Sequence, residues 1–355
     1  MSYQLAILKN DSSDDHQEWI QACENGKQAI QYGIVDISRH DWFEQALGKE
    51  YDCYLTRPPA RSSVFKQMYD ERLYILSAVL KMNIYPSLEE LLIYENKRFL
   101  AYWLKANSIP HPQTWVFYHK EEARDFAKEC SLPIVAKMAI GAAGSGVAII
   151  KDRKKLEKYV DDIFSGKGVA RKWGPNLRKV ELSRRVMDRM KDIPGAIAYF
   201  RNKYVSSRAD TQKMFAILQE YIDCDFEWRA VRIGDSYFAH KKLRSFGEMF
   251  SGTSKVSWEG PSSDLLDFVK KVCDKRNFLC QAVDIFEDRR GRFLANELQS
   301  FFGSQNPHQM IINGKPGRYI DRDSRWSFEE GDFNVNNSYD LRLDHVIRLL
   351  KDRGL

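Results

Sequence analysis

The decisive stretch is residues 280–299, which read CQAVDIFEDRRGRFLANELQ. Two apolar runs flank the turn-forming letters DRRG, so the stretch predicts a β-hairpin. We take Glu287 to lie opposite Arg292, which places Asp284 opposite Ala295. The register of this hairpin then decides which of its polar side chains can meet.

Three oxygen-bearing side chains of the hairpin are expected on one face, namely Asp284, Glu297 and Gln299, because side chains alternate along a strand. Asn296 is expected to point to the other face. Two carboxylates this close repel each other unless a cation lies between them, and Mg²⁺ takes oxygen ligands that it shares with nucleotide phosphates. The hairpin therefore predicts a magnesium site, with a polar edge strand facing water as the alternative.

A second hairpin is predicted over residues 225–244, which read DFEWRAVRIGDSYFAHKKLR. Glu227 and Arg229 share a face of its first strand, where an acid and a base two residues apart suit a ribose hydroxyl and a phosphate. Lys242 and Arg244 share a face of the return strand and can neutralise charge that develops during phosphoryl transfer. The alternative is a solvated face with an ordinary ion pair.

Two further stretches upstream suit a nucleotide. Residues 134–147 read IVAKMAIGAAGSGV, a strand carrying Lys137 followed by a flap in which small residues let backbone N–H groups approach phosphate. No Lys-Ser/Thr follows its last glycine, so it is not a Walker A loop. Residues 218–222, LQEYI, end a strand whose backbone can face an adenine edge. Each stretch alone fits a plain hairpin tip or a buried strand equally well.

The first 93 residues alternate short apolar strands with helical stretches. Strands are expected at 4–8, 29–37, 51–56 and 84–85, and the clearest helix at 64–81. Such alternation predicts parallel βαβ units. The turn after the first strand reads KNDSSDD, and its three aspartates would repel a pyrophosphate, so the lobe is Rossmann-like but not a dinucleotide site.

Composition is that of an ordinary globular chain, with 43% hydrophobic and 29% charged residues among 355. No apolar run approaches the ~18 residues of a membrane span, and the N-terminus lacks the basic start of a signal peptide. We therefore expect a cytoplasmic protein. The six cysteines form no CxxC pair, so they are expected to be reduced, and a zinc site is not predicted.

Residues 165–213 carry thirteen Lys or Arg against four Asp or Glu, although the whole chain has a net charge of only +6. Solvated helices over the site are one interpretation. A lid that recruits an acidic, phosphorylated or sugar-linked substrate is another. Binding of nucleic acid or another anionic polymer is the third, and the sparse aromatic residues of the segment argue against nucleic acid.

Taken in order, the flap, the strand at 218–222 and the two hairpins resemble the ATP-grasp superfamily, which includes glutathione synthetase and D-alanine–D-alanine ligase. The resemblance covers residues 95–303 and implies an α/β (α+β) ATP-grasp fold. It implies an N-terminal Rossmann-like pre-ATP-grasp domain at 1–93 and a central lobe at 94–222 that includes the flap and the basic insertion. A C-terminal lobe with the metal site would follow at 223–355.

The resemblance also implies roles for single residues. Lys97 and Lys137 resemble the two phosphate-binding lysines, and Glu227 resembles the ribose-binding acid. The Mg²⁺ ligands, with Mn²⁺ as the alternative ion, would be Asp284, Glu297 and Gln299. The mobile flap would comprise Gly141, Gly144, Ser145 and Gly146, and the adenine hinge Gln219, Glu220, Tyr221 and Ile222.

Two departures from the family pattern stand out. The family commonly shows Glu-x-Asn where this chain has Glu297-Leu298-Gln299, so the amide oxygen has a longer reach. D-alanine–D-alanine ligase often has an arginine at the position of Ala282. The cation that stabilises the transition state is then expected to be Arg229 or Arg244.

The implied activity is an ATP- and Mg²⁺-dependent ligase that joins a small-molecule carboxylate to an amine through an acylphosphate and releases ADP and phosphate. The alternatives are an ATP-grasp kinase that phosphorylates a hydroxyl group, and an ATP-grasp scaffold that binds an anionic polymer. Similar enzymes are frequently homodimers. The two substrates are left open.

Overall fold

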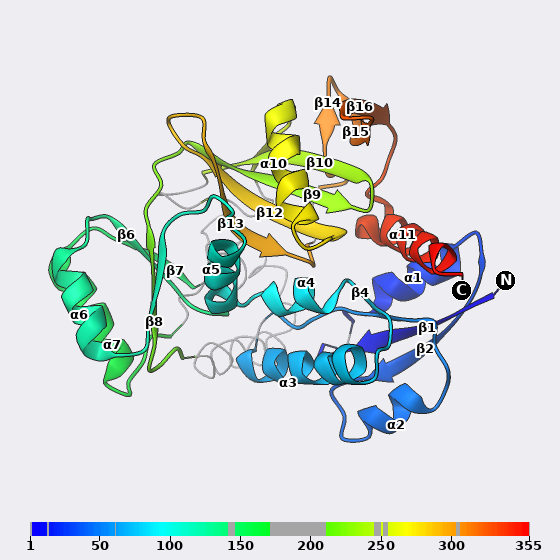
Figure 1. Cartoon of the computed structure of the whole chain (residues 1–355), viewed down its shortest axis with the longest axis horizontal. Helices are drawn as coiled ribbons and strands as arrows, with labels where there is room; N and C mark the ends of the chain where they lie inside the picture. The colour runs from blue at the N-terminus through cyan, green and yellow to red at the C-terminus, as the bar shows by residue number, and fades with distance from the viewer. Residues whose placement is uncertain are drawn as a thin grey trace, which may run out of the picture.

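A computed structural model describes residues 2–12, 14–60, 62–140, 146–170, 211–244, 250, 255–302 and 306–354. The described chain forms three β-sheets, one for each lobe expected from the sequence (Figure 1). Two expected features lie partly outside the described residues. They are the basic insertion, at 171–210, and the flap, at Gly141, Gly144 and Ser145.

The first lobe is a parallel four-stranded sheet in the order β2-β1-β3-β4, as the alternating pattern predicts. Its strands are β1 (Ser2–Lys9), β2 (Ala29–Asp36), β3 (Cys53–Leu55) and β4 (Ile84–Tyr85). Its helices are α1 (Gln17–Asn25), α2 (Trp42–Leu47), α3 (Ser63–Tyr74) and α4 (Leu88–Ile93). The helix expected at 64–81 ends its α-helical part at Tyr74 and continues as a π-helical turn, Ile75–Val79.

The central lobe is an antiparallel sheet in the order β5-β8-β6-β7. It comprises β5 (Thr114–Phe117), β6 (Ile134–Lys137), β7 (Val147–Ile150) and β8 (Ala216–Glu220). Two helices, α6 (Lys120–Glu129) and α7 (Arg153–Phe164), cover one face of this sheet and share an apolar core with it. The other face is therefore available to line a site.

The largest sheet runs β13-β12-β9-β10-β15-β14, with β11 paired to β10 and β16 to β15. Its strands are β9 (Phe226–Ile233), β10 (Ser236–Leu243), β11 (Val256–Ser257), β12 (Cys280–Glu287), β13 (Phe293–Gln299), β14 (Ile311–Ile312), β15 (Lys315–Arg322) and β16 (Arg325–Glu330). The helices that accompany it are α5 (Lys97–Ala106), α10 (Ser263–Asp274), a 3₁₀ turn (Val335–Ser338) and α11 (Tyr339–Asp352).

Strand alternation gives this large sheet two buried faces. Val283 and Ile285 of β12 belong to a core shared with α5 and α10, whereas Ala282 belongs to a core shared with the first lobe and α11. Helix α5 therefore packs on the C-terminal sheet, although its sequence falls in the range expected for the central lobe. The three sheets lie within the three expected ranges, and the domain boundaries themselves stay a prediction.

A buried carboxylate joins the first lobe to the C-terminal sheet. Glu90 caps the N-terminus of α4 through Ser87 and accepts a 2.9 Å hydrogen bond from the backbone N–H of Cys280, where β12 begins. Burial raises the pKa of Glu90 to about 7, against the lowering effect of these hydrogen bonds.

No described helix is long and apolar enough to cross a membrane.

The raised pKa of Glu90 predicts a pH dependence of stability. The folded state holds the proton more tightly than the unfolded state, so this group stabilises the fold below about pH 4.5, and the contribution is lost as pH rises to about 7. We expect the free energy of unfolding of Glu90→Gln, relative to wild type, to increase by up to about 3 kcal/mol between these pH values. Urea denaturation of both proteins across that range measures the difference, and parallel stability curves would contradict it.

Candidate active site

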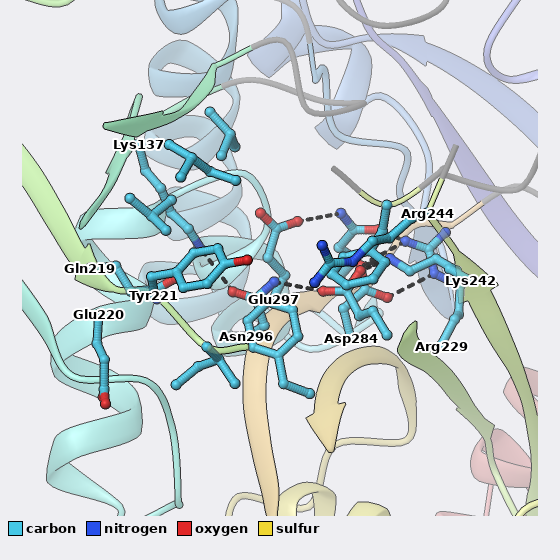
Figure 2. Close-up of a pocket in the computed structure, with 18 residues that line it drawn as sticks. Lys137, Gln219, Glu220, Tyr221, Arg229, Lys242, Arg244, Asp284, Asn296 and Glu297 are labelled. Atoms are coloured by element: carbon cyan, nitrogen blue, oxygen red, sulfur yellow. Dashed lines mark hydrogen bonds and ion pairs between the residues drawn. The ribbon is translucent and has the colours of Figure 1, made fainter. Parts of the chain in front are cut away.

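A pocket lies between the open face of the central sheet and the C-terminal sheet (Figure 2). Strands from both lobes and the connection between them line it. The lining residues are Val135, Lys137, Val147, Ile149, Gln219, Glu220, Tyr221, Ile222, Glu227, Arg229, Lys242, Arg244, Phe250, Asp284, Phe286, Asn296, Glu297 and Gln299. All the residues that the sequence singled out within the described range therefore meet here, except Lys97 and Gly146, which lie close by.

The register of the hairpin differs from the one expected. Glu287 pairs with Phe293 rather than Arg292, and Asp284 pairs with Glu297 rather than Ala295. Ile285 pairs with Ala295, so the ladder shifts between Asp284 and Ile285. A β-bulge at this point leaves one extra residue, Asn296, in β13.

The bulge overturns the expectation that Asn296 points away from the site. Its side chain lies in the pocket, where Oδ1 accepts a 2.7 Å hydrogen bond from Lys137 Nζ and Nδ2 donates a 2.7 Å bond to Glu227 Oε1 (Figure 2). The expectation failed because strict alternation of faces holds only while every residue is paired. Asp284, Glu297 and Gln299 still share a face, since the bulge falls before Glu297.

Asp284 is the centre of the site's charges. The Arg229 guanidinium donates to both of its carboxylate oxygens at 2.9 Å, and Lys242 Nζ donates to Oδ2 at 2.6 Å. Burial would raise the pKa of Asp284, but these two cations hold it well below its usual value. Lys242 also contacts Glu227 Oε2, so one ammonium group bridges two carboxylates.

Lys242 is therefore already paired with two carboxylates. From the sequence, it was expected to neutralise the negative charge that develops during phosphoryl transfer. Arg229 donates to Gln299 Oε1 at 3.3 Å as well as to Asp284, so it too is held in place. Arg244 donates to the backbone oxygen of Cys224 and lies over the Phe250 ring, 5.5 Å from its centre. Each of the three cations lines the pocket, and their catalytic roles stay a prediction.

Glu297 faces the phosphate-binding lysines expected from the sequence. Lys97 Nζ lies 3.6 Å from Glu297 Oε1 and 3.6 Å from Glu95 Oε2, and Gln299 Nε2 donates to Glu297 Oε2 at 3.2 Å. Burial would raise the pKa of Glu297, but Lys97 and Lys137 lower it. The carboxylate is thus ionised and only loosely paired.

The residues expected to bind metal fit Mg²⁺ in the kind of their donors. Two carboxylates paired across the ladder and one amide oxygen supply the hard oxygen ligands that this ion takes. Asp284 already accepts hydrogen bonds from Arg229 at 2.9 Å and from Lys242 at 2.6 Å, whereas the contact of Glu297 with Lys97 is longer, at 3.6 Å. The described residues contain no group of three His, Cys, Asp or Glu side chains suited to a metal, so Gln299 would have to complete the set.

Lys137 lies at the end of β6, is almost fully buried, and closes the network on the central-lobe side. Burial lowers its pKa to about 8, against the opposing effect of Glu297. Gly146 begins the return from the flap, and a side chain there would crowd Met138, with a Cβ 2.8 Å from the Met138 Cβ. Gln212 was not predicted from the sequence; its amide oxygen accepts a 2.7 Å hydrogen bond from the Ala139 N–H and so stabilises the start of the flap.

The expected adenine hinge follows β8. Gln219, Tyr221 and Ile222 line the pocket, and the Gln219 amide is fixed by a 3.0 Å bond to Thr114 Oγ1. The Glu220 carboxylate is exposed, accepts from the Gln113 N–H at 3.1 Å, and points away from the other labelled side chains (Figure 2). Glu220 lines the pocket while its carboxylate joins β8 to the start of β5, and its place in an adenine hinge stays a prediction.

Part of the chain is similar in sequence to two known ligases. The chain is 35% identical over 78 residues to a phosphoribosylamine–glycine ligase of Clostridium acetobutylicum, which is 21% of this chain and 19% of the relative. It is 30% identical over 93 residues to the α-aminoadipate–LysW ligase LysX of Saccharolobus solfataricus, which is 25% of this chain and 34% of the relative. The matched segments thus span no more than about a third of either relative, and no family model matches the chain.

The solved structure of the ATP-grasp ligase PsnB, complexed with a minimal precursor, Mg and ADP, covers 98% of both chains with a TM-score of 0.52 at 12% sequence identity. The chain has the ATP-grasp fold. The fold class expected from the sequence is therefore confirmed. The charged network of this chain lies in the pocket between its two antiparallel sheets.

The Arg229–Asp284 pair in this ATP-grasp pocket predicts a large stability effect. Removing one partner leaves the other charge buried, so we expect Arg229→Met to destabilise the fold by roughly 3 kcal/mol. The double variant Arg229→Met/Asp284→Leu removes both charges and is expected to recover most of that loss. Chemical denaturation of the four proteins measures the coupling, and additive losses would contradict it.

Proposed function

We propose that the chain is an ATP-dependent ligase that phosphorylates a substrate carboxylate and joins the resulting acyl group to an amine. The observation that carries this proposal is a hydrogen-bonded and ion-paired network of lysines, arginines and carboxylates around one pocket in an ATP-grasp fold. The similarity to proteins named as ligases favours ligation over phosphorylation of a hydroxyl group.

The nucleotide would lie with its base against the Gln219–Ile222 connection and its ribose at Glu227. Lys97 and Lys137 would hold the phosphates from two sides, since one begins α5 on the C-terminal sheet and the other ends β6. Glu297 and Gln299, with Asp284, would hold Mg²⁺. When bound, this ion would neutralise negative charge on the phosphate oxygens and so reduce their repulsion of the attacking carboxylate. Mn²⁺, with the same preference for oxygen, would serve in its place.

No side chain needs to act as a covalent nucleophile. The two substrates and the terminal phosphate must be brought together while charge builds on phosphate oxygens, so catalysis depends on position and on fixed cations. Arg244 is the cation best placed to respond to substrate, because its pairing with Asp223 is long, at 3.8 Å, and the Asp223 carboxylate is largely exposed. Arg229 would contribute its fixed charge from its place beside Asp284.

Glu297→Gln tests the metal and the reaction together. It keeps the shape of the side chain but removes a carboxylate that Mg²⁺ needs, so we expect a loss of at least about 100-fold in ATP turnover with the folded state retained. The matched control is Glu259→Gln, which removes a carboxylate paired with Lys241 outside the pocket. The measurement is phosphate release with hydroxylamine present to trap an acylphosphate.

The product assay separates the candidate reactions. A ligase releases ADP and free phosphate and forms a hydroxamate, whereas a kinase releases ADP and leaves a stable phosphoester. Transfer of ¹⁸O from a labelled carboxylate into phosphate supports the acylphosphate. A phosphoester product, or full activity of Glu297→Gln, would refute the proposed chemistry or the metal assignment respectively.

The low pKa of Lys137 predicts how nucleotide affinity depends on pH. As pH rises through about 8, the free protein loses the ammonium charge that would bind phosphate, so ATP affinity is expected to fall up to about tenfold by pH 9. Lys137→Arg keeps its charge over this range and is expected to show a flatter profile. Isothermal titration with ATP between pH 7 and 9.5 decides the point, and identical profiles would count against Lys137 as the titrating group.

A further inference from the structure

Asn296 is the polar residue that the β-bulge inserts between the two halves of the pocket. It belongs to β13 of the C-terminal sheet, and its two hydrogen bonds reach Lys137 of the central sheet and Glu227 of β9. Both bonds are 2.7 Å long, and both partners are buried. One amide therefore joins the lysine assigned to phosphate with the acid assigned to ribose.

An amide group suits this position because its two ends differ. The Oδ1 atom accepts from the Lys137 ammonium while Nδ2 donates to the Glu227 carboxylate, so the charges on either side fix which way the amide faces. A carboxylate here would lose the donor and repel Glu227. An alkyl side chain would leave both buried charges without this partner.

The contact with Asn296 restricts the orientation of the Glu227 carboxylate. Its Oε1 is held by Asn296 and its Oε2 by Lys242, from two different strands, so rotation of the carboxylate about its last bond is restricted. Each oxygen keeps a further lone pair for a ligand. A carboxylate fixed in this way can distinguish a correctly placed hydroxyl group from its absence, because recognition of one hydroxyl depends on acceptor direction.

We propose that Asn296 is a positioning residue that sets the preference of this site for ribonucleotides over deoxyribonucleotides, by fixing the Glu227 carboxylate against the ribose hydroxyls. The proposal rests on the proposed function, since it needs ATP in this pocket with its ribose at Glu227. Asn296 acts through Glu227 rather than on the reacting atoms. A ratio of affinities therefore reports on it better than turnover does.

The test measures dissociation constants for ATP, 2′-deoxy-ATP and 3′-deoxy-ATP by isothermal titration calorimetry. Wild type is expected to prefer ATP over at least one deoxy analogue by about tenfold or more, the usual range for a hydrogen bond to a charged group. Asn296→Ala and Asn296→Asp are expected to lose most of that preference. The control Asn313→Asp adds the same charge at an exposed turn between β14 and β15 and is expected to keep the wild-type ratio.

A double-mutant cycle separates positioning from a merely structural role. Glu227→Gln alone should reduce the preference, and adding Asn296→Ala should reduce it no further, because both changes act through one carboxylate. A structural defect would weaken the binding of all three nucleotides equally and leave the ratio of their dissociation constants unchanged. Asn296→Asp, which keeps the size and the acceptor, serves if Asn296→Ala does not fold.

Each outcome has one meaning. A ratio within twofold of wild type in folded Asn296 variants, independent losses in the cycle, or a wild type that does not distinguish the analogues would overturn the inference while ATP binding stands. A wild type that binds none of the three nucleotides would overturn the proposed function itself, and the inference with it.

Discussion

The site depends on the buried pairing of Asp284 with Arg229 and Lys242. A carboxylate this deep is too costly to keep ionised without partners, and here two cations from neighbouring strands supply them. Because the three side chains come from β9, β10 and β12, their pairing also requires those strands to lie in the observed register. The interaction thus fixes the floor of the pocket before any ligand enters.

Around that pair the described side chains form an electrically balanced network. Its cations are Lys97, Lys137, Arg229 and Lys242, and its anions are Glu95, Glu227, Asp284 and Glu297. Each of these four cations therefore already has a described side-chain partner. Arg229 is joined to Asp284 by two hydrogen bonds of 2.9 Å, whereas Lys97 Nζ lies 3.6 Å from Glu297 Oε1 and 3.6 Å from Glu95 Oε2.

Much of this arrangement could be predicted from residue spacing. Alternation put Glu227 with Arg229 on one face of β9 and Lys242 with Arg244 on one face of β10, and all four line the pocket. The parallel first lobe followed from its strand and helix order. The bulge could not be predicted, because counting back from a turn assumes that each residue has one partner and carries any error along the strand. The place of Asn296 in the pocket was missed for that reason, and the contact of the Glu220 carboxylate with Gln113 could not be predicted because the two residues are 107 positions apart.

The two lysines assigned to phosphate belong to different bodies of the fold. Lys97 begins α5, which packs on the C-terminal sheet, and the chain just after α5 continues along the edge of β13, where Ala295 N–H donates to Pro110. Lys137 lies on the central sheet. Two described contacts join these two parts of the fold beside the pocket: the Lys97 N–H donates to the Ala139 oxygen, and Lys137 donates to Asn296 Oδ1. Asn296, the residue that the bulge adds to β13, is therefore one of the described contacts that join the two parts of the fold beside the pocket, as well as part of the pocket lining.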